Sequence, residues 1–379
     1  IFFSERSFDA NDLNYVRGWI GGHVLGTSSD GAIVVTKDSF YDAKTFIRFG
    51  TRPHPGNGVC FSKDGEWLYE FDPETRLLHQ TSVESIVGPH QLGATLLPGG
   101  PLSRHRFAQI LADPYRPILY GLDSQQNQLV FIDRETLVPQ KAVVVGSLPT
   151  HMAIDASGEY MLLANFGATE IARVDLTNQA AQAKDVFVVP SNPYRLAVDP
   201  VANRIAYAEQ DGQSALTLLN GNTGAVLKRI GDLAFQPALV FDDTGRYLFA
   251  GESSGPATSL KRFDTLTNTF DPAGQAQGTF SYPARRIRFH SNNVFFAGRK
   301  FHGNTMFELG NFGEEINSIT SNGHFAASNR HIFNTGNYLE VDGLPEDSSV
   351  VTNHPSNETL YQFDNNTGSL YVKTIEASN

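Results

Sequence analysis

The chain has little cysteine, tryptophan, methionine or charge. Its 379 residues include one Cys, two Trp and three Met, and only 18% are Asp, Glu, Lys or Arg. A disulfide needs two thiols, so Cys60 alone excludes an intrachain bridge. Because Cys60 lies in the apolar phrase Gly-Val-Cys-Phe-Ser, we expect it to be buried in the core. The few tryptophans also disfavour a quinone-dependent dehydrogenase, which stacks its cofactor on Trp.

Several classes of partner and cofactor lack their usual signals. No apolar run approaches the roughly 18 residues that cross a bilayer as a helix. The 29 basic residues are outnumbered by 40 acidic ones, for a net charge of −11, which disfavours nucleic acid and anionic membrane surfaces as partners. The chain has no nucleotide-binding glycine loop in a strand–helix setting, no nucleophile-elbow serine and no calcium loop. We therefore expect no cofactor and no metal.

A phrase of one sequence type recurs through the middle of the chain. Residues 149–189 read as four short strands joined by turns, the first turn being Ala156-Ser-Gly158. The same phrase restarts at Pro193, Pro237 and Pro283. Related phrases occur before and after this region. A period of 40 to 50 residues with four strands per repeat is typical of propeller blades.

This period predicts an all-β chain with one domain, residues 1–379. We expect a single β-propeller of seven or eight four-stranded blades, because the terminal phrases are short. We expect a monomer. Ile1 to Ser7 reads as a strand without a partner nearby, and the last phrase lacks an outer strand. The sequence therefore predicts that the N-terminal strand pairs with the C-terminal blade, which would remove two free sheet edges.

The turn glycines provide a second structural prediction. Gly31, Gly65, Gly158 and Gly245 hold corresponding positions in four hairpins. Tight turns often need a positive φ, which glycine adopts without steric cost. We expect a positive φ at most of these four residues.

The central phrase resembles the YVTN repeats of bacterial and archaeal surface proteins. It reads Pro-x-x-(apolar)-Ala-(apolar)-Asp-x-x-Gly-x-Tyr, followed by three apolar residues and Ala-Asn, and the resemblance covers about residues 102–280. It implies a propeller that is secreted, periplasmic or on the cell surface. The missing initial Met leads us to expect a mature form or an excised piece. Such propellers serve binding, adhesion, lactone hydrolysis and polysaccharide cleavage alike.

The start of each innermost strand should ring one mouth of a central channel. Aligned phrases place these candidates in the ring: Arg106, Gln109, Thr150, His151, Tyr194, Arg195, Gln236, Arg285 and Arg286. Converging arginines would attract a carboxylate, sulfate or phosphate. The alternative is that each Arg pairs with an acid of the neighbouring blade. His23, His54 and His151 also fall near the ring, but they lack the close spacing of metal ligands.

Two functions stay open on these residues. The preferred one is a binding protein whose partner is a carbohydrate, such as an anionic saccharide, or a cell-surface protein. The alternative is a lyase or hydrolase acting on a uronate-type saccharide. In that case His151, Tyr194 and Arg195 would form the catalytic trio, while Arg106, Gln109, Gln236, Arg285 and Arg286 would bind the substrate.

Overall fold

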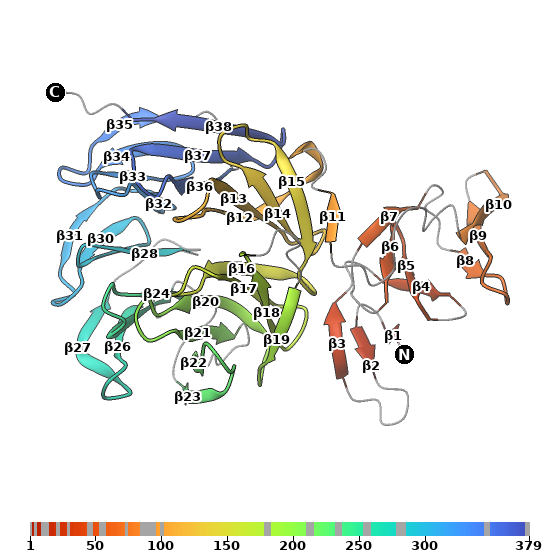
Figure 1. The fold of residues 1–379 in the computed structure, drawn as a ribbon, viewed down its shortest axis with the longest axis horizontal. Helices are drawn as coiled ribbons and strands as arrows, with labels where there is room; N and C mark the ends of the chain where they lie inside the picture. Colours follow the sequence, from red (N-terminus) through yellow and green to blue (C-terminus); the bar gives the residue numbers. More distant parts are fainter. Residues whose placement is uncertain are drawn as a thin grey trace.

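The computed structural model is built almost entirely of β-strands (Figure 1). It describes residues 102–177, 183–209, 216–231, 237–252, 259–277, 286–344 and 349–375, with shorter pieces at 2–3, 6–8, 15–19, 23–28, 31–43, 48–52, 58–72, 75–83 and 96–98. Helical structure is scarce in these ranges and includes the 3₁₀ turn η1 (Leu102–Arg104). None of their helices has the length and apolar character that a membrane span requires.

From β12 onward, the described strands form seven consecutive antiparallel sheets. The first contains β12 (Phe107–Ala112), β13 (Ile118–Asp123), β14 (Gln128–Asp133) and β15 (Pro139–Val144), with β11 (Leu96–Pro98) added beside β15. The second contains β16 (Pro149–Ile154), β17 (Tyr160–Asn165), β18 (Glu170–Asp175) and β19 (Ala183–Val188). The third contains β20 (Pro193–Val198), β21 (Arg204–Glu209), β22 (Leu216–Asn220) and β23 (Val226–Ile230).

The remaining four sheets repeat this order. The fourth contains β24 (Ala238–Phe241), β25 (Tyr247–Glu252), β26 (Ser259–Asp264) and β27 (Thr269–Gln277). The fifth contains β28 (Ile287–His290), β29 (Asn293–Phe296), β30 (Arg299–His302) and β31 (Glu308–Asn311). The sixth contains β32 (Ser318–Ile319), β33 (Phe325–Ala327), β34 (His331–Asn334) and β35 (Glu340–Gly343). The seventh contains β36 (Ser349–Asn353), β37 (Thr359–Asp364) and β38 (Ser369–Thr374).

The second strand of these sheets is buried on both faces. All six residues of β37 are buried, and β17, β21 and β25 are buried except at their first residue. Strands covered on both faces lose the alternation of apolar and polar residues and read as continuous apolar runs. By contrast, the outer strand β23 is exposed along most of its length. The second strands therefore lie between neighbouring sheets, whereas β23 lies at the outer edge of its sheet.

The seventh sheet packs against the first. One core cluster contains Phe107 and Ile110 of β12 together with Val350, Tyr361 and Phe363 of the seventh sheet. The rings of Phe107 and Phe363 lie 4.4 Å apart between centroids.

Hydrogen bonds reinforce this junction. The side chain of Asn365 accepts from the main-chain N–H of Phe107 at 2.7 Å and donates to its carbonyl at 2.9 Å. The contact between the two sheets therefore combines packing with side-chain hydrogen bonds.

The prediction that the N-terminal strand pairs with the last sheet is wrong. β1 (Phe2–Phe3) pairs with β2 (Arg6–Phe8), which pairs with β3 (Tyr15–Trp19), in a separate sheet. Within the described residues, the sheet β36-β37-β38 keeps three strands. The prediction missed this because β1 is only two residues long and finds its partner four residues later in a local hairpin.

Two further sheets precede the seven. One contains β4 (Val24–Thr27), β5 (Ile33–Thr36), β6 (Ser39–Asp42) and β7 (Arg48–Thr51), and the other contains β8 (Gly58–Phe61), β9 (Trp67–Asp72) and β10 (Leu77–Ser82). In Figure 1 they lie to one side of the seven sheets. They pack face to face through Ile33, Val35, Phe40 and Leu68.

The expectation of a buried Cys60 is wrong. Cys60 is exposed and lies opposite Tyr69 in the register of β8 and β9. Leu68, which packs on the preceding sheet, points to the other face of β9. Cys60 thus faces away from the preceding sheet, whereas its neighbours Val59 and Phe61 pack against it.

The glycine prediction is confirmed. Gly31, Gly65, Gly158 and Gly245 have φ values of 71°, 79°, 73° and 70°. Asp155 explains why the turns are so regular, because one of its carboxylate oxygens accepts from the main-chain N–H groups of residues 159 and 160, each at 3.0 Å. The repeated Asp and Gly therefore stabilise the same turn, the Asp through its side-chain hydrogen bonds and the Gly through its positive φ.

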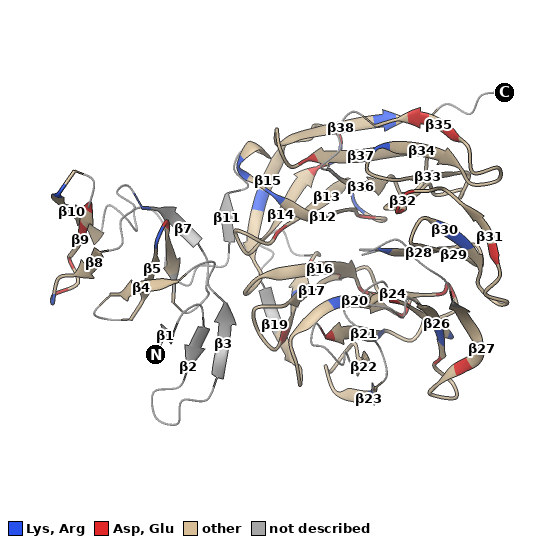
Figure 2. Ribbon diagram, turned by 180° about the vertical axis from the view of Figure 1, so that it is seen from behind, with Lys and Arg blue, Asp and Glu red and all other residues tan. Residues whose placement is uncertain are grey.

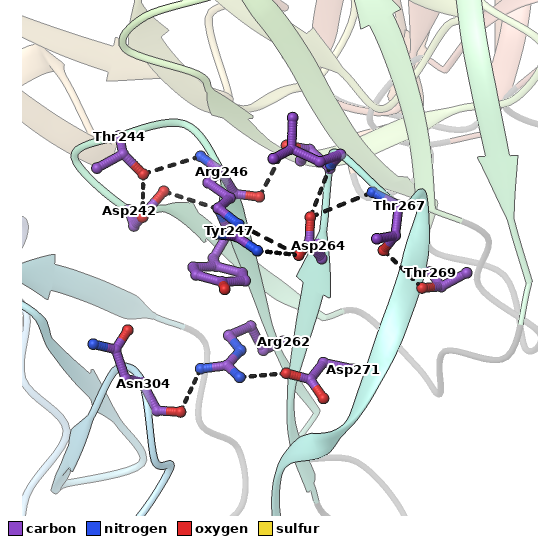
Figure 3. Close-up of polar contacts among 12 residues, drawn as sticks. Asp242, Thr244, Arg246, Tyr247, Arg262, Asp264, Thr267, Thr269, Asp271 and Asn304 are labelled. Atoms are coloured by element: carbon purple, nitrogen blue, oxygen red, sulfur yellow. Dashed lines mark hydrogen bonds and ion pairs between the residues drawn. The ribbon is translucent and has the colours of Figure 1, made fainter.

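Arginine side chains link neighbouring sheets away from the centre (Figure 3). Arg262 of β26 is buried, forms an ion pair with Asp271, and donates to the carbonyls of Gly303 and Asn304 at 2.8 and 2.6 Å. Its guanidinium also lies 4.5 Å from the centroid of the Tyr247 ring. This one side chain therefore joins the fourth sheet to the β30–β31 turn of the fifth.

Replacing Arg262 with Met should lower the free energy of unfolding by about 2–4 kcal/mol, because it leaves Asp271 and two carbonyls without their donor. Arg246→Met is the matched control, since Arg246 pairs with Asp264 of the same sheet from a half-exposed position. That variant should change stability little. Urea unfolding of both variants measures the difference. Equal losses would show that Arg262 is not a link between sheets.

Candidate functional site

The first strands of the seven sheets surround a central cavity. They occupy the inner side of the array in Figure 1, and the cavity volume is about 380 Å³. Its lining includes residues on or just before β12, β16, β20, β24, β28, β32 and β36. All seven described sheets thus contribute to one site. The lining residues are Ala108, Gln109, Ile110, Ser124, Thr150, His151, Tyr194, Arg195, Ala238, Leu239, Arg286, Ile287, Arg288, Glu315, Asn317, Asn329 and Val351.

The structure brings five of the eight predicted site residues to this cavity: Gln109, His151, Tyr194, Arg195 and Arg286. Arg106 is not among the lining residues. Its Nη1 donates to the carbonyls of Ser103 and His105 instead. Gln236 and Arg285 lie outside the described residues.

The strand register shows that Gln236 lies two residues before the position in the fourth repeat that corresponds to His151 and Arg195. His151 lies opposite Ala164 and Arg195 opposite Ala208, each four residues before the aspartate that begins the first turn. Counting back four residues from Asp242 in the fourth sheet reaches Ala238, which lies opposite Gly251. The proline that marks the phrase lies six residues before the aspartate in the two preceding repeats and five before it in this one, so the phrases do not align in one register.

Gln109 lines the cavity, but its side chain hydrogen-bonds to the main chain of a neighbouring strand. Its side-chain amide donates to the carbonyl of Met152 at 3.1 Å and accepts from the Met152 N–H at 2.9 Å. These bonds join β12 to β16, so both ends of the amide already have partners. We therefore assign Gln109 to positioning the two strands rather than to holding a ligand.

Three arginines bring positive charge to the cavity. Arg195 donates to the Thr150 carbonyl at 3.0 Å, and its guanidinium lies 4.5 Å from the centroid of the Tyr194 ring. Arg288 donates from Nε to the Asn317 carbonyl at 2.8 Å. Arg286 is the third, and it lies just before β28. Figure 2 shows the basic positions of β20 and β28 in blue.

Glu315 is the one acidic residue among the described lining residues. Its carboxylate accepts from the main-chain N–H of Arg286 at 2.7 Å. The alternative prediction was that each arginine pairs with an acid of the neighbouring blade. The described lining contains one carboxylate for three guanidinium groups. The described lining therefore carries more positive than negative charge, in a chain that is acidic as a whole.

Arg288 and Glu315 were not predicted. Arg288 follows Arg286 by two residues, and side chains two apart on a strand share a face, so the pattern contained a signal for Arg288. The sequence contained no signal for Glu315, because it lies just before β32, a first strand of only two residues.

His151 is uncharged at neutral pH. Burial lowers its pKa well below 6.5, and the positive charges of Arg195, Arg288 and Arg286 lower it further. The residue is half-buried, and its accessible surface lies inside the cavity. Its Nδ1 is buried and has no hydrogen-bond partner among the described atoms. His151 thus offers the cavity a neutral ring rather than the positive charge expected from sequence.

Arg288 stays charged at neutral pH. Burial lowers its pKa to about 10, Arg195 lowers it as well, and Glu315 opposes the shift. The positive charge of the cavity therefore rests on its arginines.

The lowered pKa of His151 predicts a loss of stability in acid. The unfolded chain takes up a proton on His151 near pH 6.5, whereas the folded chain resists it until a lower pH. Stability due to this residue is therefore complete above about pH 6.5 and falls, by up to about 1.4 kcal/mol per pH unit, as the pH drops toward the folded-state pKa.

The variant His151→Asn should lack this component. Denaturant unfolding of both proteins between about pH 7 and pH 5 should show the variant losing less stability than the wild type. Parallel curves would contradict the shifted pKa.

No metal centre is found in the described part of the chain, where no three His, Cys, Asp or Glu residues gather in a suitable arrangement. His23 is exposed, and His54 lies outside the described residues. The expectation of no metal stays a prediction.

Structural comparison identifies the fold. The β-propeller domain of Cps50 (Swd1) from Myceliophteria thermophila matches with a TM-score of 0.59 and 17% identity, over 72% of this chain and 97% of that one. Hydrazine synthase from Kuenenia stuttgartiensis matches with a TM-score of 0.58 and 15% identity, over 76% and 99%. The chain therefore contains a β-propeller, as predicted.

The sequence itself narrows the assignment no further. No protein-family model and no curated protein matches the chain. The resemblance to YVTN repeats is supported only as far as the propeller fold, and at these identities the matched structures carry no information about activity.

Proposed function

We propose that residues 102–375 form a seven-bladed ring closed by packing of its last sheet on its first, and that the central cavity binds an anionic group. In this proposal the chain is a secreted or cell-surface binding protein, acts as a monomer, and recognises an acidic carbohydrate. A carboxylate, sulfate or phosphate would accept hydrogen bonds from the arginines.

The excess of arginine in the cavity is the observation that carries this proposal. Arg195, Arg286 and Arg288 come from two sheets and line one cavity. Guanidinium groups present a planar fork of donors that suits carboxylate and phosphate. Burial is the main cause of the lowered pKa of Arg288, and the charge of Arg195 adds to it, so a bound anion would stabilise the charged guanidinium.

The test is binding of glucuronate, measured by titration calorimetry at low salt. The double variant Arg195→Ala/Arg286→Ala should lose at least tenfold in affinity, and wild-type affinity should fall as salt rises, because charges at the open mouth are screened. Arg106→Ala is the control, since it removes one arginine near the ring that does not line the cavity.

Retained affinity in the folded double variant would refute the site. So would an equal loss in the control. Circular dichroism of each variant separates loss of binding from loss of the fold.

A lyase is the second candidate, and the state of His151 favours it. A neutral imidazole beside arginines is the form that can remove a proton alpha to a carboxylate held by those arginines. Tyr194 lines the same cavity and could protonate the leaving oxygen.

Incubation with polygalacturonate or polyglucuronate should then produce an unsaturated sugar, detected by its ultraviolet absorbance, and His151→Asn should abolish it. Binding without any product would reject the lyase and leave the binding protein.

A further inference from the structure

A second cavity continues the central channel beyond the arginines. Its volume is about 500 Å³. The first cavity is lined by the starts of the inner strands, such as Thr150 and Tyr194. The second is lined by their ends, including Ile154 and Val198. Since these strands line the same channel, the two cavities open toward opposite ends of it.

The two cavities share several lining residues. Residues that line both of them include Gln109, His151, Leu239, Arg288 and Asn317. These residues therefore lie between the two spaces. Arg288 contributes to both, so a ligand that contacts its guanidinium can extend in either direction.

The second cavity differs in chemistry from the first. Its lining includes half-buried apolar side chains from four inner strands, which are Ile154, Val198, Val240 and Phe289. These residues belong partly to the cores between sheets and partly to the channel wall. Apolar surface facing an internal space favours an apolar occupant.

Charge sets the direction in which a ligand would lie. Asp242 and Asp243 contribute to the lining of the second cavity, at the ends of the strands. They disfavour an anionic group there, whereas the arginines favour one in the first cavity. An elongated ligand would therefore place its acid among the arginines and its apolar part beyond them.

We propose that the channel binds an amphipathic anion, that is, an acidic sugar or similar acid that carries an apolar substituent. The acidic group occupies the cavity of Arg195, Arg286 and Arg288. The substituent passes Arg288 and contacts Val198, Val240 and Phe289. This inference rests on the proposed function, because the arginine cavity supplies the anchoring charge.

The test uses one acidic head group with tails of increasing length. Methyl, butyl and hexyl glucuronide are titrated into the full chain, below any concentration at which they associate. Each methylene that leaves water for an apolar wall contributes about 0.8 kcal/mol, or about fourfold in affinity. Hexyl glucuronide should therefore bind at least tenfold more tightly than methyl glucuronide.

Two variants test where the tail lies. Val198→Thr/Val240→Thr keeps the side-chain shape and makes both positions polar, so it should reduce the advantage of the hexyl tail by at least threefold while methyl glucuronide binds as before. Val226→Thr on the exposed outer strand β23 is the matched control and should change neither affinity.

The outcomes separate the two proposals. If no glucuronide binds, the proposed function fails. If methyl glucuronide binds through the arginines and the hexyl form binds no better, the arginine site stands and the amphipathic ligand is refuted. If the hexyl advantage persists in Val198→Thr/Val240→Thr, the second cavity is not where the tail lies, and the inference is overturned.

Discussion

Face-to-face packing of one sheet on the next is the constraint on which this structure depends. Leu163 and Phe249 are fully buried in second strands whose two faces both touch other sheets. A single four-stranded sheet of this composition would expose one such face to water, and burial of apolar surface is the main favourable term in folding. The seventh sheet meets the same requirement by packing its Phe363 on Phe107 of the first.

The central cavity follows from the same arrangement. Seven inner strands are held around one space, and their side chains cannot all be large. Ala238 occupies the position that His151 and Arg195 hold in the two preceding sheets, and this leaves room for the arginines. Because His151 and Arg288 are buried in the cavity wall, their charged forms are poorly solvated, and this lowers the pKa of both. The packing of the sheets thus sets the electrostatics of the site.

The sequence predicted the fold through its period and several site residues through strand position. His151, Tyr194, Arg195, Arg286 and Gln109 could be placed because the Asp and Gly of the first turn fix where each inner strand begins. Two kinds of information were missing. In the fourth repeat the proline lies one residue closer to the turn aspartate, so the phrase did not show that Ala238 corresponds to His151 and Arg195. No local pattern shows that the side-chain amide of Gln109 would hydrogen-bond to the main chain of Met152. Long-range contacts of this kind depend on how neighbouring sheets meet, which one repeat read alone does not contain.

The junction between the first and seventh sheets has a mechanical consequence. In the described residues it is held by the Phe107–Phe363 contact and by the two hydrogen bonds of Asn365, with no strand shared across it. Residues at this junction come from opposite ends of the seven-sheet segment, so tension applied to those ends would load this contact directly. Every other junction has the continuous chain running across it. The junction between the first and seventh sheets is therefore the one that would separate first under force.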